Sequence, residues 1–175
     1  MLKRLFRPRP AKAAGDALYA RTVTQSRSPA LYADLGAPDT VEGRFELYSL
    51  HIYLLLERLK GQGDQAAETA QALFDTYISA LDNSLREMGV GDLSVGKKMR
   101  KLGEVFYGRV TSLEEAFAAL PDTAELSAML ARTVYEGADA AKAPKLAAYV
   151  LKQREHLRAL PLERLCAGDV EWTAP

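Results

Sequence analysis

The sequence predicts an all-α protein, folded as an irregular bundle of about six helices in a single domain. Apolar residues recur at alternating steps of three and four along several long segments, which is the spacing of one face of a helix. Glycine and proline residues separate these segments. No segment alternates apolar and polar residues for long enough to predict a strand. With 175 residues, 48% of them hydrophobic, the chain is long enough to bury one core.

The first half of the chain contains the helix with the clearest pattern. Residues 11–26 predict a weak helix, and residues 29–35 predict a turn or a short helix. The next helix can be capped by Asp39 or Thr40 and ends at Gly61. Its apolar stripe consists of Phe45, Tyr48, Ile52, Leu55 and Leu59, and is widened by Leu47, Leu50 and Leu54. A stripe of this width indicates a central helix.

The second half predicts four more helices with the same spacing, over residues 64–88, 93–120, 123–136 and 143–160. Gly89 ends the first of these as a left-handed C-cap, and Asp92 or Ser94 caps the second. The two helices therefore form a helical hairpin. Asp122 or Thr123 caps the helix after it.

The predicted helical domain covers residues 13–165, between a basic tail at 1–12 and a C-terminal tail at 166–175 that either packs or extends. The basic tail has five Lys and Arg residues and no acid, in a chain whose net charge is zero. Its apolar residues share one side of a helical turn, which favours contact with an anionic membrane surface. A solvated tail and a transit peptide are the alternatives. The predicted membrane-surface residues are Leu2, Lys3, Arg4, Leu5, Phe6 and Arg7.

Composition excludes several classes of protein. The 23 Lys and Arg residues balance 23 Asp and Glu residues, so no overall basic field favours nucleic acid. Cys166 is a single cysteine and forms no internal disulfide, and with only His51 and His156 beside it a zinc site is not expected. The longest apolar run, residues 52–56, is far shorter than the roughly 20 residues of a membrane span. With no secretory signal either, we expect a cytoplasmic or organelle-matrix protein.

Residues 91–98 partly match the P-loop pattern of nucleotide-binding proteins. Lys98 stands where that pattern has a hydroxyl that binds magnesium. A genuine P-loop follows a buried strand, whereas a long amphipathic helix precedes this one. We therefore expect no nucleotide.

The helix predicted over residues 93–120 is unusually rich in glycine. Gly96 and Gly103 are seven residues apart and lie nearly on one face, with Gly108 further on. Each interior glycine costs about 1 kcal/mol relative to alanine. Close approach of another backbone can offset that cost, and this backbone belongs either to a neighbouring helix or to a bound segment of a partner.

No catalytic constellation emerges from the sequence. Neither histidine has a metal-ligand companion one helical turn away, so structural or surface roles are favoured. Asp82 and Arg86 are four residues apart and predict a surface ion pair within one helix. The sequence thus predicts no catalytic residue, no metal and no cofactor.

Several runs resemble the ubiquinol-cytochrome c chaperone family over about residues 40–150. These runs are GRFEL at 43–47, LH at 50–51, LLLERL at 54–59, DNSLREMGVGDLSVGKKM at 82–99 and FYGR at 106–109. The block from Arg86 to Lys98 is the most specific, because it is long and contains few residues that merely fill helices.

The resemblance implies a helical, non-enzymatic assembly factor of the cytochrome bc1 complex, with newly made cytochrome b as its client. It also implies contact with a ribosome or a second assembly factor. The short chain is similar to the bacterial branch of the family, which implies a cytoplasmic location peripheral to the inner membrane. Haem would belong to the client. A generic helical adaptor, or an interaction protein associated with ribosome or membrane, is the alternative.

The physical pattern and the resemblance together suggest a partner-binding surface. It centres on the glycine-containing helix that begins near Val95, where charged residues flank apolar ones. The candidate residues are Arg44, Phe45, Glu46, Arg86, Asp92, Gly96, Lys97, Lys98, Met99, Gly103, Tyr107 and Arg109.

Overall fold

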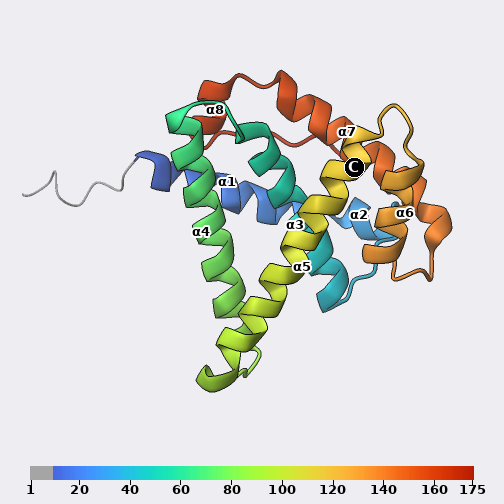
Figure 1. Ribbon diagram of the computed structural model, residues 1–175, viewed down its shortest axis with the longest axis horizontal. Helices are drawn as coiled ribbons and strands as arrows, with labels where there is room; N and C mark the ends of the chain where they lie inside the picture. The colour runs from blue at the N-terminus through green and yellow to red at the C-terminus, as the bar shows by residue number, and fades with distance from the viewer. Residues whose placement is uncertain (1–9) are drawn as a thin grey trace, which may run out of the picture.

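The computed structural model describes residues 10–175, which fold into eight α-helices and one 3-10 helix without any strand (Figure 1). The α-helices are α1 (Pro10–Ser26), α2 (Pro29–Ala33), α3 (Val41–Leu59), α4 (Asp64–Glu87), α5 (Asp92–Ala118), α6 (Ala124–Thr133), α7 (Ala143–Ala159) and α8 (Leu162–Cys166), and the 3-10 helix η2 is Ala140–Lys142. The all-α, single-domain prediction is confirmed. Helices α2 and α8 have only five residues each, and the six longer helices are the five that the apolar spacing predicts together with α1, which was predicted as a weak helix.

Helix α3 lies at the centre of the fold and packs on α1, α4, α5 and α7. Every side chain from residue 49 to residue 55 is buried, as expected for a helix that is surrounded on all sides. Of the two capping residues predicted for this helix, Thr40 is the one used, because its hydroxyl oxygen accepts the N–H of Gly43 at 3.0 Å. At the start of α6, a carboxylate oxygen of Asp122 accepts the N–H of Ala124 at 2.9 Å.

Helix α1 packs most extensively on α4. The contact depends on Gly15, which is buried where the two backbones approach each other. A Cβ atom at this position would lie only 2.6 Å from the backbone nitrogen of Leu73 on α4. Glycine is therefore required here by close packing, although the sequence pattern of the weak α1 helix gave no reason to single it out.

Helix α7 is held on α3 by a half-buried ion pair. The guanidinium group of Arg154 donates to both carboxylate oxygens of Glu57, at 2.5–2.9 Å. The same guanidinium lies over the ring of Phe117 on α5, 3.9 Å from the ring centroid. One charged side chain thus joins three helices.

The C-terminal segment packs into the body of the protein. Val170 is fully buried, and the amide group of Gln153 on α7 donates to Thr173 and accepts its N–H. Trp172 lies edge-on against His51 of α3, with ring centroids 5.1 Å apart. Of the two alternatives for residues 166–175, packing is the one that the structure shows.

The helical part of the chain begins at Pro10, earlier than the predicted start of the domain at residue 13. Because α1 begins at Pro10, Lys12 already belongs to that helix and pairs with Asp16 at 2.9 Å. The predicted membrane-surface residues lie outside the described part of the chain; they are Leu2, Lys3, Arg4, Leu5, Phe6 and Arg7. Among residues 10–175, no helix combines the length and the apolar character needed to span a membrane.

Helices α4 and α5 form the predicted hairpin, and it protrudes from the body. In Figure 1 the two helices converge at a tip at the bottom of the view, away from α7 and α8. At the opposite end of the hairpin the helices separate: α4 packs on α1, α3 and α8, whereas α5 packs on α3 and α6.

Candidate functional site

The turn at the hairpin tip is closed by backbone geometry and by one arginine. Gly89 has a φ angle of +82°, and its N–H bonds to the carbonyl oxygen of Arg86 at 2.9 Å, so it ends α4 as predicted. Arg86 donates to Asp82 at 2.6 Å, which confirms the predicted ion pair, and also to Asp92 on α5. These hydrogen bonds hold the pKa of Arg86 above its ordinary value. Arg86 and Asp92 therefore connect the two helices across the turn.

The predicted side-chain cap of α5 is wrong. Gly91, which has no side chain, occupies the N-cap position, and no side chain of the described residues caps the helix there; the carboxylate of Asp92 bonds to Arg86 instead. Residues 91–98, which partly fit the P-loop pattern, are the N-cap and the first turns of α5. They follow the helix α4, not a strand.

Three large apolar side chains of the hairpin are exposed to solvent. Leu93 is 102% exposed at the first turn of α5, Met88 is exposed at the end of α4, and Tyr107 is 61% exposed further along α5. Sequence reasoning selected Tyr107 but missed Met88 and Leu93. The missed signal is that Leu93 falls off the buried stripe of α5, nearly opposite Val95 and Phe106.

The glycines of α5 face open space. A Cβ atom added at Gly96, Gly103 or Gly108 would meet no atom within 4 Å among the described residues. The explanation that these glycines allow close packing against a neighbouring helix of this fold is therefore wrong. Gly96, Gly103 and Tyr107 share one side of the helix, because they are spaced by seven and four residues; we call them the α5 stripe.

The first turns of α5 also carry unpaired positive charge. Lys97, Lys98, Arg100 and Lys101 are exposed, and no acidic side chain of residues 10–175 lies within ion-pair distance of any of them. Met99, another candidate residue, lies between them and is partly buried. The stretch from residue 93 to residue 103 contains four cations and no acid.

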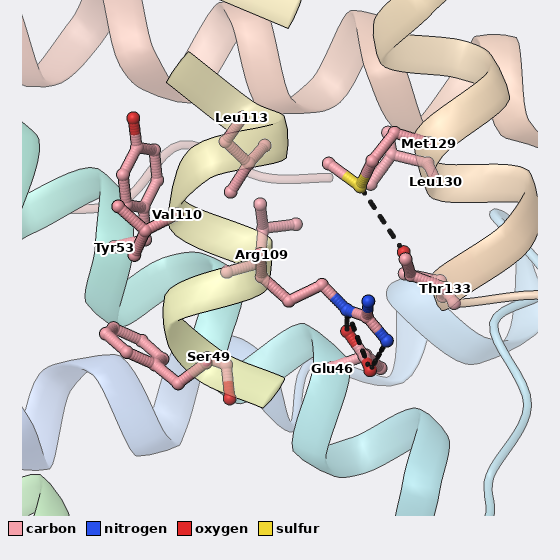
Figure 2. A pocket seen from close by; sticks show the side chains of 12 residues that line it. Glu46, Ser49, Tyr53, Arg109, Val110, Leu113, Met129, Leu130 and Thr133 are labelled. Carbon is pink, nitrogen blue, oxygen red and sulfur yellow. Dashed lines mark hydrogen bonds and ion pairs between the residues drawn. The ribbon is translucent and has the colours of Figure 1, made fainter. Parts of the chain in front are cut away.

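Two other candidate residues pair with each other at the base of the hairpin. Arg109 on α5 donates to both carboxylate oxygens of Glu46 on α3, at 2.8–3.2 Å (Figure 2). The adjoining space, lined by Tyr53 and Met129 among others, has a volume of about 10 Å³. This is room for about one water molecule, so the Glu46–Arg109 pair joins α5 to α3 beside a filled interior.

The remaining candidates lie at the start of α3. Arg44 is exposed and pairs with Asp39 at 2.6 Å, while Phe45 is partly buried. The structure thus brings Glu46 to the base of the hairpin but leaves Arg44 directed to another neighbour. A wide, open hollow between α1 and α4 is lined by polar side chains, including Asp16 and Asp75.

The buried titratable groups form a structural network. His51 is fully buried; its Nδ1 donates to the carbonyl oxygen of Leu47, and its Nε2 accepts the hydroxyl of Tyr149, both at 2.7 Å. Burial lowers the pKa of His51 to about 4 and raises the pKa of Tyr149 to about 12. Gln25 donates to the Tyr149 hydroxyl at 2.8 Å. Among residues 10–175, no group of three or more His, Cys, Asp or Glu side chains is arranged to hold a metal ion.

The fold and this surface define a class of protein: an all-helical single domain with a protruding two-helix hairpin whose outer face carries exposed apolar and basic side chains. The chain belongs to the ubiquinol-cytochrome C chaperone family, whose family model matches residues 33–172. The resemblance noted from the sequence is thus confirmed. It also extends to the C-terminal segment that packs on α7.

Individual relatives agree with this assignment. The chain is 27% identical over 138 residues to ubiquinol-cytochrome-c reductase complex assembly factor 1 of Xenopus laevis, covering 77% of this chain and 68% of that protein. It is 28% identical to the mouse and human proteins of the same name, and spans 46% of their length. Among solved structures it is similar to the crystal structure of the Cbp3 homolog from Brucella abortus, with a TM-score of 0.87 and 38% identity. That match covers 99% of this chain and 97% of the other.

Proposed function

We propose that this chain is an assembly chaperone that binds newly made cytochrome b and promotes its maturation into the cytochrome bc1 complex. We place it in the cytoplasm, peripheral to the inner membrane. The match of the chaperone family model to residues 33–172 carries this proposal. The relatives named as assembly factors of the ubiquinol-cytochrome-c reductase complex support the choice of complex.

We propose that the client contacts the α5 stripe. Cytochrome b is a membrane protein, and its apolar segments need temporary cover before they are inserted. The open backbone at Gly96 and Gly103 lets an approaching chain come closer than any residue with a side chain would allow. Tyr107, at the end of the stripe, offers an apolar ring face together with a polar hydroxyl.

The ring of Tyr107 rests on a fixed aromatic layer between α4 and α5. Its centroid lies 5.9 Å from that of Phe106 and 6.5 Å from that of Phe74. Phe106 in turn lies 5.3 Å from the buried ring of Tyr77. A rigidly supported ring loses little conformational entropy when a partner binds, which favours its use as a contact residue.

The other candidate residues divide between contact and support. Lys97, Lys98 and Met99 lie near the stripe and are proposed to contact the client. Arg86 with Asp92, and Arg109 with Glu46, are proposed to hold α5 in place through the ion pairs described above. Arg44 and Phe45 lie on α3 and are proposed to contact the client at the edge of the surface.

Site-specific cross-linking tests the proposed contact. A photo-reactive amino acid at Tyr107 or Met99, in cells that are synthesising cytochrome b, is expected to give a cytochrome b adduct. The same probe at Val41, which is equally exposed on α3, is expected to give none. Adducts at Val41 alone would remove the contact from α5.

A pair of glycine variants makes the test sharper. Gly103→Leu fills the stripe, whereas Gly108→Leu adds the same side chain to open space about 140° away around the helix. Only Gly103→Leu is expected to reduce the adduct and the amount of assembled bc1 complex.

Deletion of the gene tests the function itself. Selective loss of cytochrome b and the bc1 complex, with other respiratory complexes intact, is the expected result. Normal bc1 levels, or a broad defect in translation, would contradict the proposal and favour a general adaptor.

A further inference from the structure

The geometry of the hairpin tip points to a function that goes beyond client binding: we propose that the tip docks on the surface of an anionic phospholipid bilayer. The tip patch consists of Met88, Leu93, Lys97, Arg100 and Lys101. It belongs to the described part of the chain, shares Lys97 with the proposed client surface, and does not include the basic residues before Pro10.

The apolar part of the patch lies where a membrane could reach it. Met88 and Leu93 flank the turn at residues 89–91, at the protruding end of the hairpin (Figure 1). Leu93 is exposed over its whole surface, so residues 10–175 give this side chain no apolar contact. Because the tip lies apart from the body, Leu93 can enter the headgroup layer while the rest of the protein remains in water.

The basic part of the patch lies on the same face, behind Leu93. Lys97, Arg100 and Lys101 follow Leu93 at four, seven and eight residues, which is the spacing of one helix face. Along the axis of α5 they are about 6, 10 and 12 Å from Leu93. Interfacial apolar side chains are buried about 5–10 Å into the boundary between headgroups and acyl chains, so a leucine at this depth would place the cations behind it near the level of the phosphates. Their long side chains can adjust to that level.

The charges of the patch are available for lipid. No acidic side chain of the described residues is within ion-pair distance of Lys97, Arg100 or Lys101. Asp92, the acid next to Leu93, is already bonded to Arg86. A chain of zero net charge thus carries a locally positive tip, which matches an anionic surface in charge.

The combination of leucine and cations favours lipid over RNA. Nucleic-acid backbones attract Lys and Arg but offer no apolar environment to an aliphatic side chain. Of these two ligands, only a bilayer uses both parts of the patch. RNA binding through the cations alone is therefore an alternative outcome that the experiment can recognise.

Vesicle flotation of the full chain tests the proposal. The vesicles are phosphatidylcholine alone, or phosphatidylcholine mixed with phosphatidylglycerol. Each basic residue near an anionic surface strengthens binding about fivefold, so the double variant Lys97→Gln/Arg100→Gln is expected to bind about 30-fold more weakly to the anionic vesicles. Leu93→Ser is expected to reduce binding about tenfold.

Matched controls carry the same chemical changes elsewhere. Arg132→Gln/Lys145→Gln removes two exposed charges from α6 and α7, where no ion pair of the described residues uses them. Val41→Ser removes an exposed apolar side chain from α3. Both controls are expected to bind anionic vesicles within twofold of the unchanged protein. Residues 1–9 are present in every variant, so their contribution is constant.

A probe at the tip reports insertion directly. A polarity-sensitive fluorophore on Leu93→Cys is expected to shift to the blue with anionic vesicles and to be quenched by lipids carrying a quencher in their acyl chains. The same fluorophore on Val41→Cys is expected to do neither. Cys166 is buried and is not expected to react.

Two results would overturn the proposal. One is unchanged flotation of both tip variants. The other is loss of poly(U) binding in Lys97→Gln/Arg100→Gln with no effect of Leu93→Ser on vesicles, which would assign the cations to RNA. A protein that still cross-links to cytochrome b through Tyr107 but fails on vesicles would keep the proposed function and lose only the membrane site.

Discussion

Removal of a single hydroxyl group, by Tyr149→Phe, tests the buried network that joins α1, α3 and α7. The hydroxyl donates to Nε2 of His51 at 2.7 Å and accepts from Gln25 at 2.8 Å. Gln25 retains a second acceptor, the carbonyl oxygen of Thr173 at 3.0 Å. Among the described residues, Nε2 of His51 has no second donor, and its Nδ1 already donates to Leu47.

The expected destabilisation follows from the hydrogen bonds that remain in Tyr149→Phe. One fully buried acceptor is left without a partner, which destabilises a protein by about 1–3 kcal/mol. We expect Tyr149→Phe to lower the free energy of unfolding by about 2 kcal/mol, and Tm by about 4–8 °C for a protein of this size. The other tautomer of His51 gives no rescue, because it would place a lone pair against the Leu47 carbonyl oxygen.

Urea unfolding followed by circular dichroism measures the effect. Tyr107→Phe is the matched control, since it removes the same hydroxyl from an exposed ring, and it is expected to change stability by less than about 0.5 kcal/mol. If Tyr149→Phe were as stable as Tyr107→Phe, the His51 network would not contribute as the hydrogen bonds indicate.

Three further predictions concern the same fold. Gly15→Ala places a Cβ against the backbone of α4 and is expected to lower the free energy of unfolding by about 1–3 kcal/mol. Gly108→Ala adds a Cβ in open space and is expected to raise the free energy of unfolding by up to about 1 kcal/mol. Chemical denaturation measures both changes. Glu57→Gln removes the carboxylate that pairs with the half-buried Arg154 and is expected to lower the free energy of unfolding by roughly 2 kcal/mol. Because burial lowers the pKa of His51 from 6.5 to about 4, the folded state favours the neutral ring. The stabilisation of the folded state by the neutral ring is complete above pH 6.5 and is lost as the pH falls towards 4. Unfolding experiments at a series of pH values are expected to show a loss of roughly 3 kcal/mol in the free energy of unfolding.

Each of these has a control within the chain. Asp39→Asn breaks an exposed ion pair with Arg44 and is expected to leave the free energy of unfolding nearly unchanged, so an equally small effect of Glu57→Gln would contradict the argument from burial. His51→Gln is expected to flatten the pH profile between 6.5 and 4. Equal stability of Gly15→Ala and Gly108→Ala would show that α1 and α4 can separate without cost.

Local signals predicted much of this fold. The apolar spacing of residues 64–88 and the glycine at position 89 define where α4 ends, because both act within a few residues along the chain. The ion pair of Asp82 with Arg86 is likewise a property of one helix. The family was recognisable for the same reason, since the run from Arg86 to Lys98 is continuous in sequence.

Features that depend on distant segments were not predictable in this way. Gly15 and Gly96 have similar helical surroundings in sequence, yet one touches the backbone of another helix and the other faces solvent. The packing of the C-terminal segment depends on Gln25 and Thr173, which are 148 residues apart. The position of Leu93 off the apolar stripe of α5 indicates locally that it is not part of the core, whereas its complete exposure depends on how the hairpin protrudes from the body (Figure 1).

The hairpin has a mechanical consequence for the domain. Its two arms are anchored on different helices, α4 on α1 and α8 and α5 on α6, while Arg86 joins them at the far end. Helices resist bending, so a load on the tip must be shared between two anchoring points on separate parts of the body. Occupancy of the tip is therefore expected to alter amide hydrogen exchange in α1 and in α6 together, although neither helix lies near the bound surface.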